Sequence, residues 1–495
     1  MKRDGDAIAF VLGHKNRNYF ATICRMHLVT IGMNSKMNVK GREIMRKNRA
    51  ALAMSMLCCL LAGCGMNASP ADLVRSPKMD AGQQEVSQAL SIFLPPGAKM
   101  VVPRRPDNQS AVTEIDFDGD GQDEVVVNYK EERNDYEINT LVLGKTAKGW
   151  EKRAELKGLA QDLDYFSAVD VTGDKRPEVV IGYSGGDNLD RELDVYAYRN
   201  GGMQQMWKQP YKAMDVGDLT GGGTAEIAIM EHDHDKMTAS AALYDFLTGK
   251  PHKLDELPTE GAINGYNQAL IGLAAPGRNA LFVDAGIGAH SEYTALIMWQ
   301  NGKLQNVLKK DDNDTALTFK TYPLASADAN GDGIVEIGLQ TEPAGSEQLA
   351  IVEIPFIESW YQWDGRNGLK LVGESYSDYG AGFTFTIPDN WRGKFTLQRE
   401  QGIDNGSVVF LYLPEFPQKK VQLMRLLECK RSDWVKVEQD LKKQGAVYGI
   451  LSQNKTKLVL AVQPADEPAP RSAHREEYQQ MRLTLPQIKQ YFRTF

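Results

Sequence analysis

Four short loops hold the side chains whose types and spacing are best suited to chemistry. Each loop begins with an Asp and ends eight residues later with a Glu. The first offers the carboxylates of Asp116, Asp118, Asp120 and Glu124 and the main-chain carbonyl of Gln122. Oxygens at alternate positions of a tight loop can converge on one hard cation, and Ca²⁺ takes six to eight such ligands. The first loop is therefore predicted to bind calcium.

The loop near residue 330 repeats this arrangement. It offers Asp328, Asn330, Asp332, the Ile334 carbonyl and Glu336. As in the first loop, Gly occupies the sixth position, where a residue that tolerates positive φ lets the chain turn sharply. We predict a second calcium site here.

The remaining two loops depart from the pattern. One of them offers Asp170, Thr172, Asp174 and Glu178. Lys175 replaces its sixth-position Gly, so we expect calcium there on a less complete loop. The other loop, 218–226, has Gly222 where the fifth-position ligand should stand, and we expect no cation in it.

The ligand spacing resembles that of an EF-hand loop, but the context differs. A strand is expected after each loop in place of a helix, and Val127 and Leu339 stand where an EF-hand has its bidentate Glu. The alternative is that these are acidic β-turns whose side chains cap their own main chain. If calcium binds, its role would be structural, since a cation that binds the folded state stabilises it by mass action.

The loops belong to a longer repeat, which supplies the elements that position them. Their leading Asp residues are 54, 48 and 110 residues apart, and 274–283, near the middle of the last interval, keeps the pattern without the acids. Each loop precedes an apolar strand, and a second strand pair with a Gly or Asn turn follows, as in 141–156. About five such repeats of roughly 50 residues across 112–372 are typical of β-propeller blades.

The acidic loops resemble FG-GAP/VCBS repeats, which are found in integrin-α-like β-propellers. The resemblance covers about 260 residues. It implies a mainly β protein in which 86–372 form a propeller of about five blades, with a strand from 86–103 closing the ring. The loops between the second and third strands of each blade would share one rim, where we expect a protein or glycan ligand.

The N-terminal residues indicate export. The basic stretch Met45–Arg49 precedes 13 apolar or small residues, too few to span a bilayer of about 30 Å. The run ends in Leu-Ala-Gly-Cys64, which resembles the bacterial lipobox. This resemblance implies a lipoprotein signal peptide over 45–64 and an acylated Cys64 that anchors the protein to the extracytoplasmic face of a bacterial membrane. Residues 1–44 are expected to be a non-structural extension, and 65–85 a tether.

Charge and cysteine content exclude several classes of protein. The formal charge is −8, and residues 1–63 hold 11 basic and 3 acidic residues, which leaves −16 on the remainder. Because phosphate contacts need Lys and Arg, nucleic acid is not an expected partner. Of five cysteines, only Cys429 would stay free in the mature chain, so no internal disulfide is expected.

Two segments look like catalytic or metal motifs, but both occupy loops of the repeat. Gly182–Gly186 matches G-x-S-x-G around Ser184, yet no helix is expected after it, as a nucleophile elbow requires. His232 and His234 share one face of a strand and could bind zinc. We favour a solvated acidic loop there, and no catalytic residue is predicted.

The region 373–495 is expected to form a small α+β domain. Its opening Phe-Thr-Phe-Thr-Ile-Pro and the following Trp391 resemble the start of PsbP/Mog1-like lipoprotein domains. Strands are expected within 382–391, 394–399, 407–413, 421–427, 446–451 and 457–462, and helices within 432–445 and 473–495.

These features predict a lipid-anchored binding or scaffolding protein of the cell envelope, without catalytic activity and with a calcium-stabilised propeller. Two alternatives stand beside it. One is an envelope enzyme, a polysaccharide lyase or hydrolase on a propeller scaffold, which would need basic and aromatic residues along one cleft. The other is an accessory or sensor lipoprotein of a membrane complex. A fold alone does not decide among them.

Overall fold

The computed structural model describes residues 81–106, 110–186, 191–308, 316–400, 406–413, 420–464 and 474–495. The chain divides into two compact units, residues 1–98 and 99–495. In the first unit the described part holds helix α2 (Ala81–Phe93). The second unit is mainly β, and its described strands form six sheets. The proposed lipidation site Cys64 and the segments 1–44 and 45–64 lie outside the described residues.

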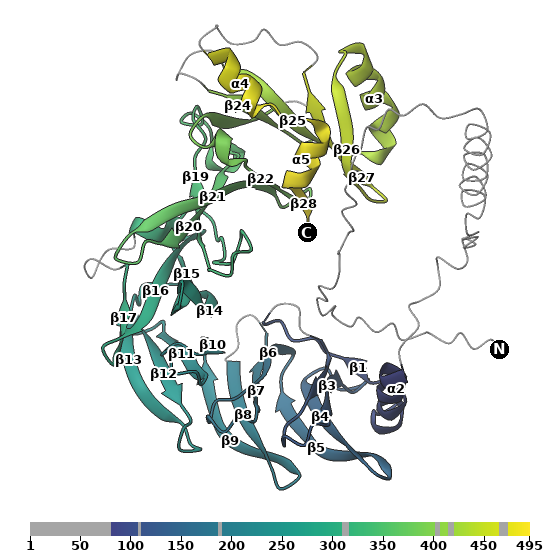
Figure 1. The fold of residues 1–495 in the computed structure, drawn as a ribbon, viewed down its shortest axis with the longest axis vertical. Helices are drawn as coiled ribbons and strands as arrows, with labels where there is room; N and C mark the ends of the chain where they lie inside the picture. Colours follow the sequence, from purple (N-terminus) through teal and green to yellow (C-terminus); the bar gives the residue numbers. More distant parts are fainter. Residues whose placement is uncertain are drawn as a thin grey trace, which may run out of the picture. The chain divides into compact units, whose positions relative to one another are not determined.

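Four consecutive sheets share one plan, in which successive strands pair antiparallel with their neighbours (Figure 1). The first sheet contains β2 (Val112–Ile115), β3 (Glu124–Lys130), β4 (Glu137–Thr146) and β5 (Gly149–Leu159). The second contains β6 (Asp162–Val169), β7 (Glu178–Ser184), β8 (Arg191–Arg199) and β9 (Gly202–Tyr211). The third contains β10 (Ala213–Gly217), β11 (Glu226–Asp233), β12 (Thr238–Asp245) and β13 (His252–Thr259). The fourth contains β14 (Gly265–Ala275), β15 (Arg278–Ile287), β16 (Ser291–Gln300) and β17 (Lys303–Asn306), and β18 (Phe319–Lys320) also pairs with β16.

The second strand of the four-stranded unit is buried on both faces in the first two sheets. In β7 every residue is buried, and in β3 all but the last are buried. Such strands need near-continuous runs of Val and Ile, which the sequence supplies, because side chains on both faces are shielded from water. The fourth strands β5 and β9 expose many polar residues and lie at the edges of their sheets.

Each sheet packs against the next through an apolar cluster. Val126 of the first sheet and Ile181 of the second belong to one cluster, and Val195 of the second and Ile229 of the third belong to another. Further clusters join the third sheet to the fourth and the fourth to the fifth. The order of the sheets in space therefore follows the order of the repeats in sequence.

The fifth sheet crosses the predicted domain boundary at residue 372. It contains β19 (Ile337–Thr341), β20 (Ile357–Trp363), β21 (Leu369–Asp378), β22 (Phe383–Thr386) and β28 (Phe492–Thr494). Strand β21 spans the boundary, and β28, at the far end of the described chain, pairs with β22. The repeat region and the C-terminal region thus share one hydrogen-bonded sheet.

The sixth sheet lies entirely in the C-terminal region. Its strands, in spatial order, are β23 (Phe395–Arg399), β24 (Ser407–Tyr412), β25 (Val421–Lys430), β27 (Lys457–Gln463) and β26 (Val447–Gln453). Helices α3 (Trp434–Lys443), α4 (Arg475–Met481) and α5 (Leu485–Tyr491) accompany it. Leu441 of α3 is buried against the sheet, while Tyr376 and Phe410 belong to a core that joins the fifth and sixth sheets. These strands and helices fall where the sequence predicted them.

The expectation that a strand within 86–103 closes the ring is wrong for 86–93, and among the described strands the short one at 99–100 pairs within the first sheet and not with the fifth. Residues 86–93 lie in α2, where Val86, Ala89 and Leu90 are buried. Strand β1 (Lys99–Met100) pairs with β3 and so extends the first sheet. The following Arg105 forms a bridge to Tyr165, and its guanidinium lies 2.8 Å from the Asp164 carboxylate.

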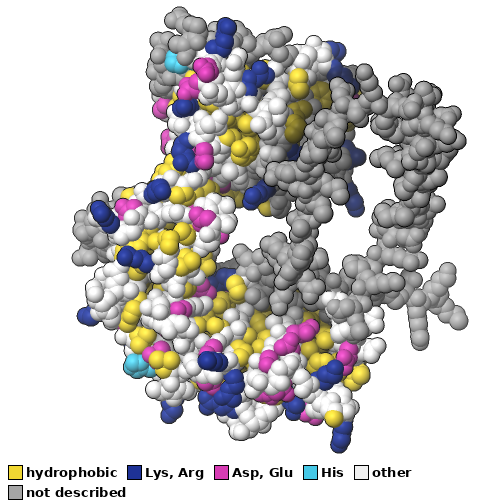
Figure 2. Space-filling view, in the orientation of Figure 1, with side chains coloured by type: hydrophobic (Ala, Val, Ile, Leu, Met, Phe, Trp, Pro, Cys, Tyr) yellow, Lys and Arg dark blue, Asp and Glu magenta, His cyan; other side chains and the backbone are white. Residues whose placement is uncertain are grey.

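The described helices include none that is both long and apolar enough to cross a bilayer. Acidic and basic side chains are interspersed over the face shown in Figure 2.

Candidate functional site

The first acidic loop brings three carboxylates together. One oxygen each from Asp116, Asp118 and Asp120 lies within 4.8 Å of the others. Two ligands of a single Ca²⁺ lie at most about 5 Å apart, because each is about 2.5 Å from the ion. The spacing of the three carboxylates is therefore within the range that ligands of one cation can have.

Asp116 also shapes the loop that it begins. Its two oxygens accept hydrogen bonds from the main-chain N–H groups of Gly119 at 2.7 Å and Gly121 at 3.0 Å. Both glycines have positive φ, 78° and 82°, a main-chain conformation that other residues adopt only at an energetic cost. The alternative predicted from sequence, self-capping of an acidic turn, is thus present in the same loop as the cation geometry.

The Glu that ends each loop accepts a hydrogen bond from the main chain near the start of the same loop. Glu124 is 5% exposed and accepts a hydrogen bond from the Phe117 N–H at 3.1 Å. Burial raises the pKa of Glu124, the Phe117 hydrogen bond opposes this, and the nearby Asp118 and Asp120 carboxylates add to the increase. Equivalent hydrogen bonds join Val171 to Glu178 at 3.1 Å, Leu219 to Glu226 at 2.8 Å and Ala329 to Glu336 at 2.8 Å. One oxygen of each Glu is therefore committed to the main chain, a role that the ligand spacing does not predict.

The loop that begins at Asp328 holds the second group of converging carboxylates. Oxygens of Asp328, Asp332 and Glu336 lie within 4.8 Å of one another. Gln362 of β20 reaches this group and donates to Asp332 at 2.8 Å and to Glu336 at 2.7 Å. No local motif could have identified Gln362, because it lies 26 residues beyond Glu336 and reaches the loop through sheet pairing. The Asn330 amide also donates to Glu336, at 2.9 Å.

The predicted ligands of the second loop are engaged otherwise. Arg176 forms an ion pair with Asp174 at 2.6 Å, and this hydrogen bond lowers the pKa of Asp174. Asp170 caps the N–H groups of Gly173 and Lys175, and Thr172 donates to Glu178 at 3.2 Å. Among the described residues, two groups of three acidic side chains have ligand atoms this close, and neither is in this loop.

Neighbouring loops are hydrogen-bonded to one another. The Ala225 N–H of the third loop donates to the Asp170 carbonyl of the second at 3.2 Å. The Asn279 amide of the fourth repeat donates to the Asp218 carbonyl of the third. The loops therefore link adjacent sheets at the end where each second strand begins, so a cation that stiffens one loop would stiffen the contact between sheets.

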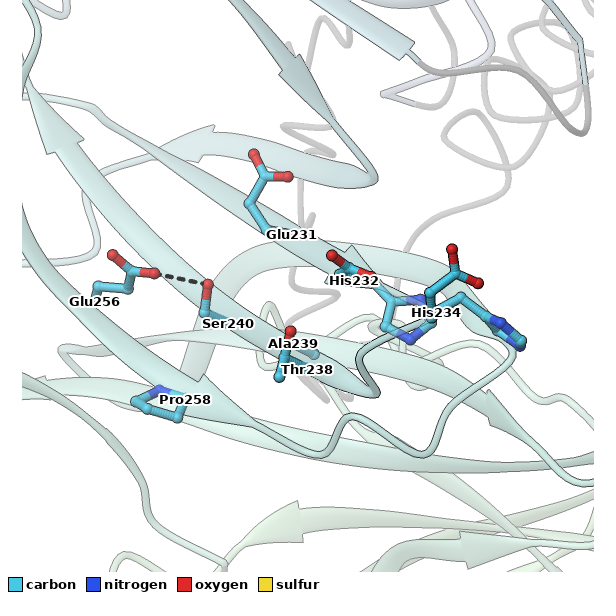
Figure 3. Close-up of a pocket in the computed structure, with 10 residues that line it drawn as sticks. Glu231, His232, His234, Thr238, Ala239, Ser240, Glu256 and Pro258 are labelled. Carbon is cyan, nitrogen blue, oxygen red and sulfur yellow. Dashed lines mark hydrogen bonds between the residues drawn. The ribbon is translucent and has the colours of Figure 1, made fainter.

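A pocket of about 760 Å³ lies in the third sheet (Figure 3). It is at the end of β11 opposite to the acidic loop, which precedes Glu226. It includes Glu231, His232, His234 and Glu256. The rings of His232 and His234 are 6.0 Å apart, and His232 Nε2 lies 3.2 Å from the Gly261 carbonyl. We call this the rim pocket.

The rim pocket lacks a preformed metal group among its described residues. No third ligand atom joins the two histidines within 4.8 Å, and Asp233 is paired with Lys236 at 2.6 Å. Glu256 accepts a hydrogen bond from Ser240 at 3.0 Å. The zinc interpretation therefore has no support from the geometry, whereas the polar walls could hydrogen-bond a ligand.

The G-x-S-x-G segment provides no exposed nucleophile. Ser184 ends strand β7, is 2% exposed, and its hydroxyl accepts a hydrogen bond from the Gly186 N–H at 3.2 Å. The next loop residues, 187–190, lie outside the described part.

Comparisons with known proteins yield only remote likenesses. No family model matches the chain, and no curated protein matches it. The rhamnogalacturonan lyase YesW is 14% identical over 63% of this chain and 65% of its own, with a TM-score of 0.26. The exotype rhamnogalacturonan lyase YesX is 12% identical over 66% and 84%, with a TM-score of 0.28. The Dos1 propeller is 10% identical over 56% and 64%, with a TM-score of 0.28.

The chain thus spans slightly under two thirds of the YesW chain. Likenesses at these TM-scores carry no argument about what this protein does.

Proposed function

We propose that this protein is a lipid-anchored binding or scaffolding protein of the bacterial envelope, with acidic loops that bind structural Ca²⁺. The observation that carries the calcium proposal is the pair of loops in which three carboxylates converge within 4.8 Å. Two of the three groups in the first loop, Asp118 and Asp120, are exposed, so a cation could reach them from solvent.

Electrostatics favours a cation at both loops. Like charges held at this spacing repel each other. Burial raises the pKa of Glu336, hydrogen bonds from Gln362 and the Ala329 N–H oppose this, and the Asp332 and Asp328 carboxylates add to the increase. A divalent ion would replace this repulsion with attraction. Its binding free energy would then add to the stability of the folded state.

The finer architecture is part of the same proposal. We count five blades from the four repeated sheets and the β19–β21 portion of the fifth, so that the repeats run to Asp378 and not to 372, and a small α+β region follows. Anchoring through an acylated Cys64 would hold the folded body outside the membrane, where millimolar calcium can saturate weak sites.

The test is thermal unfolding of the full-length chain in detergent, with EDTA and with millimolar calcium. Calcium at about 100 times its Kd should add about 2.7 kcal/mol per site. Asp118→Asn combined with Asp120→Asn should remove the calcium-dependent rise due to the first loop while keeping acceptors for the turn. Asp123→Ala, in the same loop and exposed, removes one charge outside the convergent group and is the matched control. An identical calcium shift in both variants would contradict the first site.

The rim pocket is the place to test the second candidate, an envelope polysaccharide-acting enzyme, although its described lining contains none of the Lys, Arg or aromatic side chains expected for such an enzyme. Its walls combine the Glu231, Asp233, Asp235 and Glu256 side chains with two histidines in a volume suited to a glycan. The test is incubation with isolated envelope polysaccharides and measurement of new reducing ends. Turnover that is lost in Glu256→Gln and in His232→Ala would favour the enzyme, and binding without turnover would favour the scaffold.

A further inference from the structure

A second pocket, of about 520 Å³, lies beside strands β20 and β21. Four aromatic rings line it, from Tyr322, Phe356, Tyr376 and Tyr379. The rings of Tyr322 and Phe356 meet edge to face at 5.9 Å, and Tyr379 is 68% exposed. We call this the aromatic pocket. It is distinct from the acidic loops and from the rim pocket, with which it shares no lining residue.

The only acidic side chain among the described lining residues is Glu358, which is 6% exposed. Three hydroxyl groups donate to its carboxylate, those of Ser375 at 2.8 Å, Ser377 at 2.7 Å and Tyr379 at 2.8 Å. These bonds fix the orientation of the carboxylate against the pocket. They do not neutralise it, because a serine or tyrosine hydroxyl carries no positive charge.

No described Lys, Arg or His forms an ion pair with Glu358. The contrast is with Asp284 and Glu292, which are more completely buried and share the ammonium group of Lys320. A buried carboxylate is costly unless hydrogen bonds or an opposite charge compensate it. The three hydroxyl groups supply the hydrogen bonds, and the open side of the pocket leaves room for a positively charged ligand.

The aromatic walls select among positively charged ligands. A ring presents its negative face to a cation, and the attraction is largest where water is displaced, as in cages for alkylated ammonium groups. A metal ion would need more oxygen ligands than Glu358 provides. We propose that the aromatic pocket binds an alkylammonium group, with Glu358 as its counter-ion and the tyrosine and phenylalanine rings as its walls.

Arg399 completes the recognition. It is the one basic residue among the described lining residues, is exposed, and lies close to Tyr376. Because water screens the exposed charge of Arg399, its repulsion should weaken the binding of a buried cation only modestly. The same guanidinium can pair with an anionic group on the ligand. The pocket should therefore prefer a zwitterion such as phosphocholine to choline itself.

The test is calorimetric titration of the full-length chain, in a detergent without choline, with choline and with its uncharged isostere 3,3-dimethylbutan-1-ol. Choline should bind about tenfold more tightly than the isostere, and phosphocholine more tightly still. Equal affinity of choline and the isostere, or no heat of binding with any probe at millimolar concentration, would overturn the proposal.

Variants separate the roles of charge and ring. Glu358→Gln should lose about tenfold in choline affinity, whereas Glu342→Gln, exposed and outside the pocket, should lose none. If Glu358→Gln fails to fold, Tyr322→Leu keeps an apolar wall without its ring and should still weaken choline binding. Choline affinity unchanged in Tyr322→Leu and in every folded Glu358 variant would refute the assignment. Dihexanoylphosphatidylcholine binding more tightly than phosphocholine would identify a lipid headgroup as the source, and equal binding a soluble amine.

Discussion

Replacing Lys320 with Met should be among the most destabilising single changes in this protein. Lys320 is fully buried, and its ammonium group lies 2.9 Å from Asp284 and 2.8 Å from Glu292. It also donates to the Leu324 carbonyl. The two carboxylates are as buried as the lysine, so no water can replace the ammonium group when it is removed.

The magnitude follows from the charge that remains. At an effective dielectric of about 20, each pair attracts by roughly 6 kcal/mol, most of which repays desolvation. Removing one partner of a buried pair leaves an uncompensated charge and costs about 3 to 5 kcal/mol. Ser326 still donates to Asp284 through its N–H and hydroxyl, at 2.8 and 3.0 Å, and this keeps the expected loss within that range.

The assay is urea unfolding of Lys320→Met beside Lys157→Met. Lys157 pairs with Glu137 at 3.1 Å, but its side chain is 53% exposed, and such a pair is worth at most about 1 kcal/mol. Adding Asp284→Asn and Glu292→Gln to Lys320→Met should recover part of the loss, because the stranded charges are then removed. Equal losses in the two lysine variants would refute the reasoning, as would a triple variant less stable than Lys320→Met.

Two further predictions concern Lys175 in the second acidic loop and Asp164 in strand β6. Lys175 has φ 69° at a position where the other loops have Gly, so Lys175→Gly should stabilise the protein by about 0.5 kcal/mol in urea unfolding, after the entropy cost of Gly; a loss of stability would contradict this. Burial alone would raise the pKa of Asp164, but Arg105 and a tyrosine hydroxyl hold it below its ordinary value. The stability from this carboxylate is therefore present above about pH 4 and lost as pH falls through its lowered pKa. Asp164→Asn should unfold at lower urea than the parent at pH 7, with the difference shrinking toward pH 2; a constant difference would contradict the linkage.

The features that the sequence predicted are those encoded locally. The nine residues from Asp116 to Glu124 contain both the turn and the carboxylates that converge in it, so their spacing was sufficient. Helix α2 was missed although Val86, Ala89, Leu90 and Phe93 recur at helical spacing. The helical signal was present, but the same residues were expected to supply the strand that closes the ring.

The features that the sequence could not predict depend on contacts between distant segments. Gln362 of β20 donates a hydrogen bond to Glu336, which lies 26 residues earlier at the end of an acidic loop. Lys320 donates to two carboxylates that lie 36 and 28 residues away. Glu358 belongs to the same class, since its donors are 17 to 21 residues away on β21 and the turn after it. Sequence separation of this size carries no periodic signature.

The fifth sheet affects how the protein can be divided for expression. A cut at residue 372 would pass through β21, the strand that pairs with β20 on one side and β22 on the other. The released C-terminal fragment would keep residues 373–378 of β21 paired with β22, but it would expose the edge of these residues that pairs with β20, together with core residues such as Tyr376. Unpaired apolar edges promote aggregation. A soluble C-terminal fragment should therefore begin no later than β19, and the repeat and C-terminal regions should melt as one calorimetric transition.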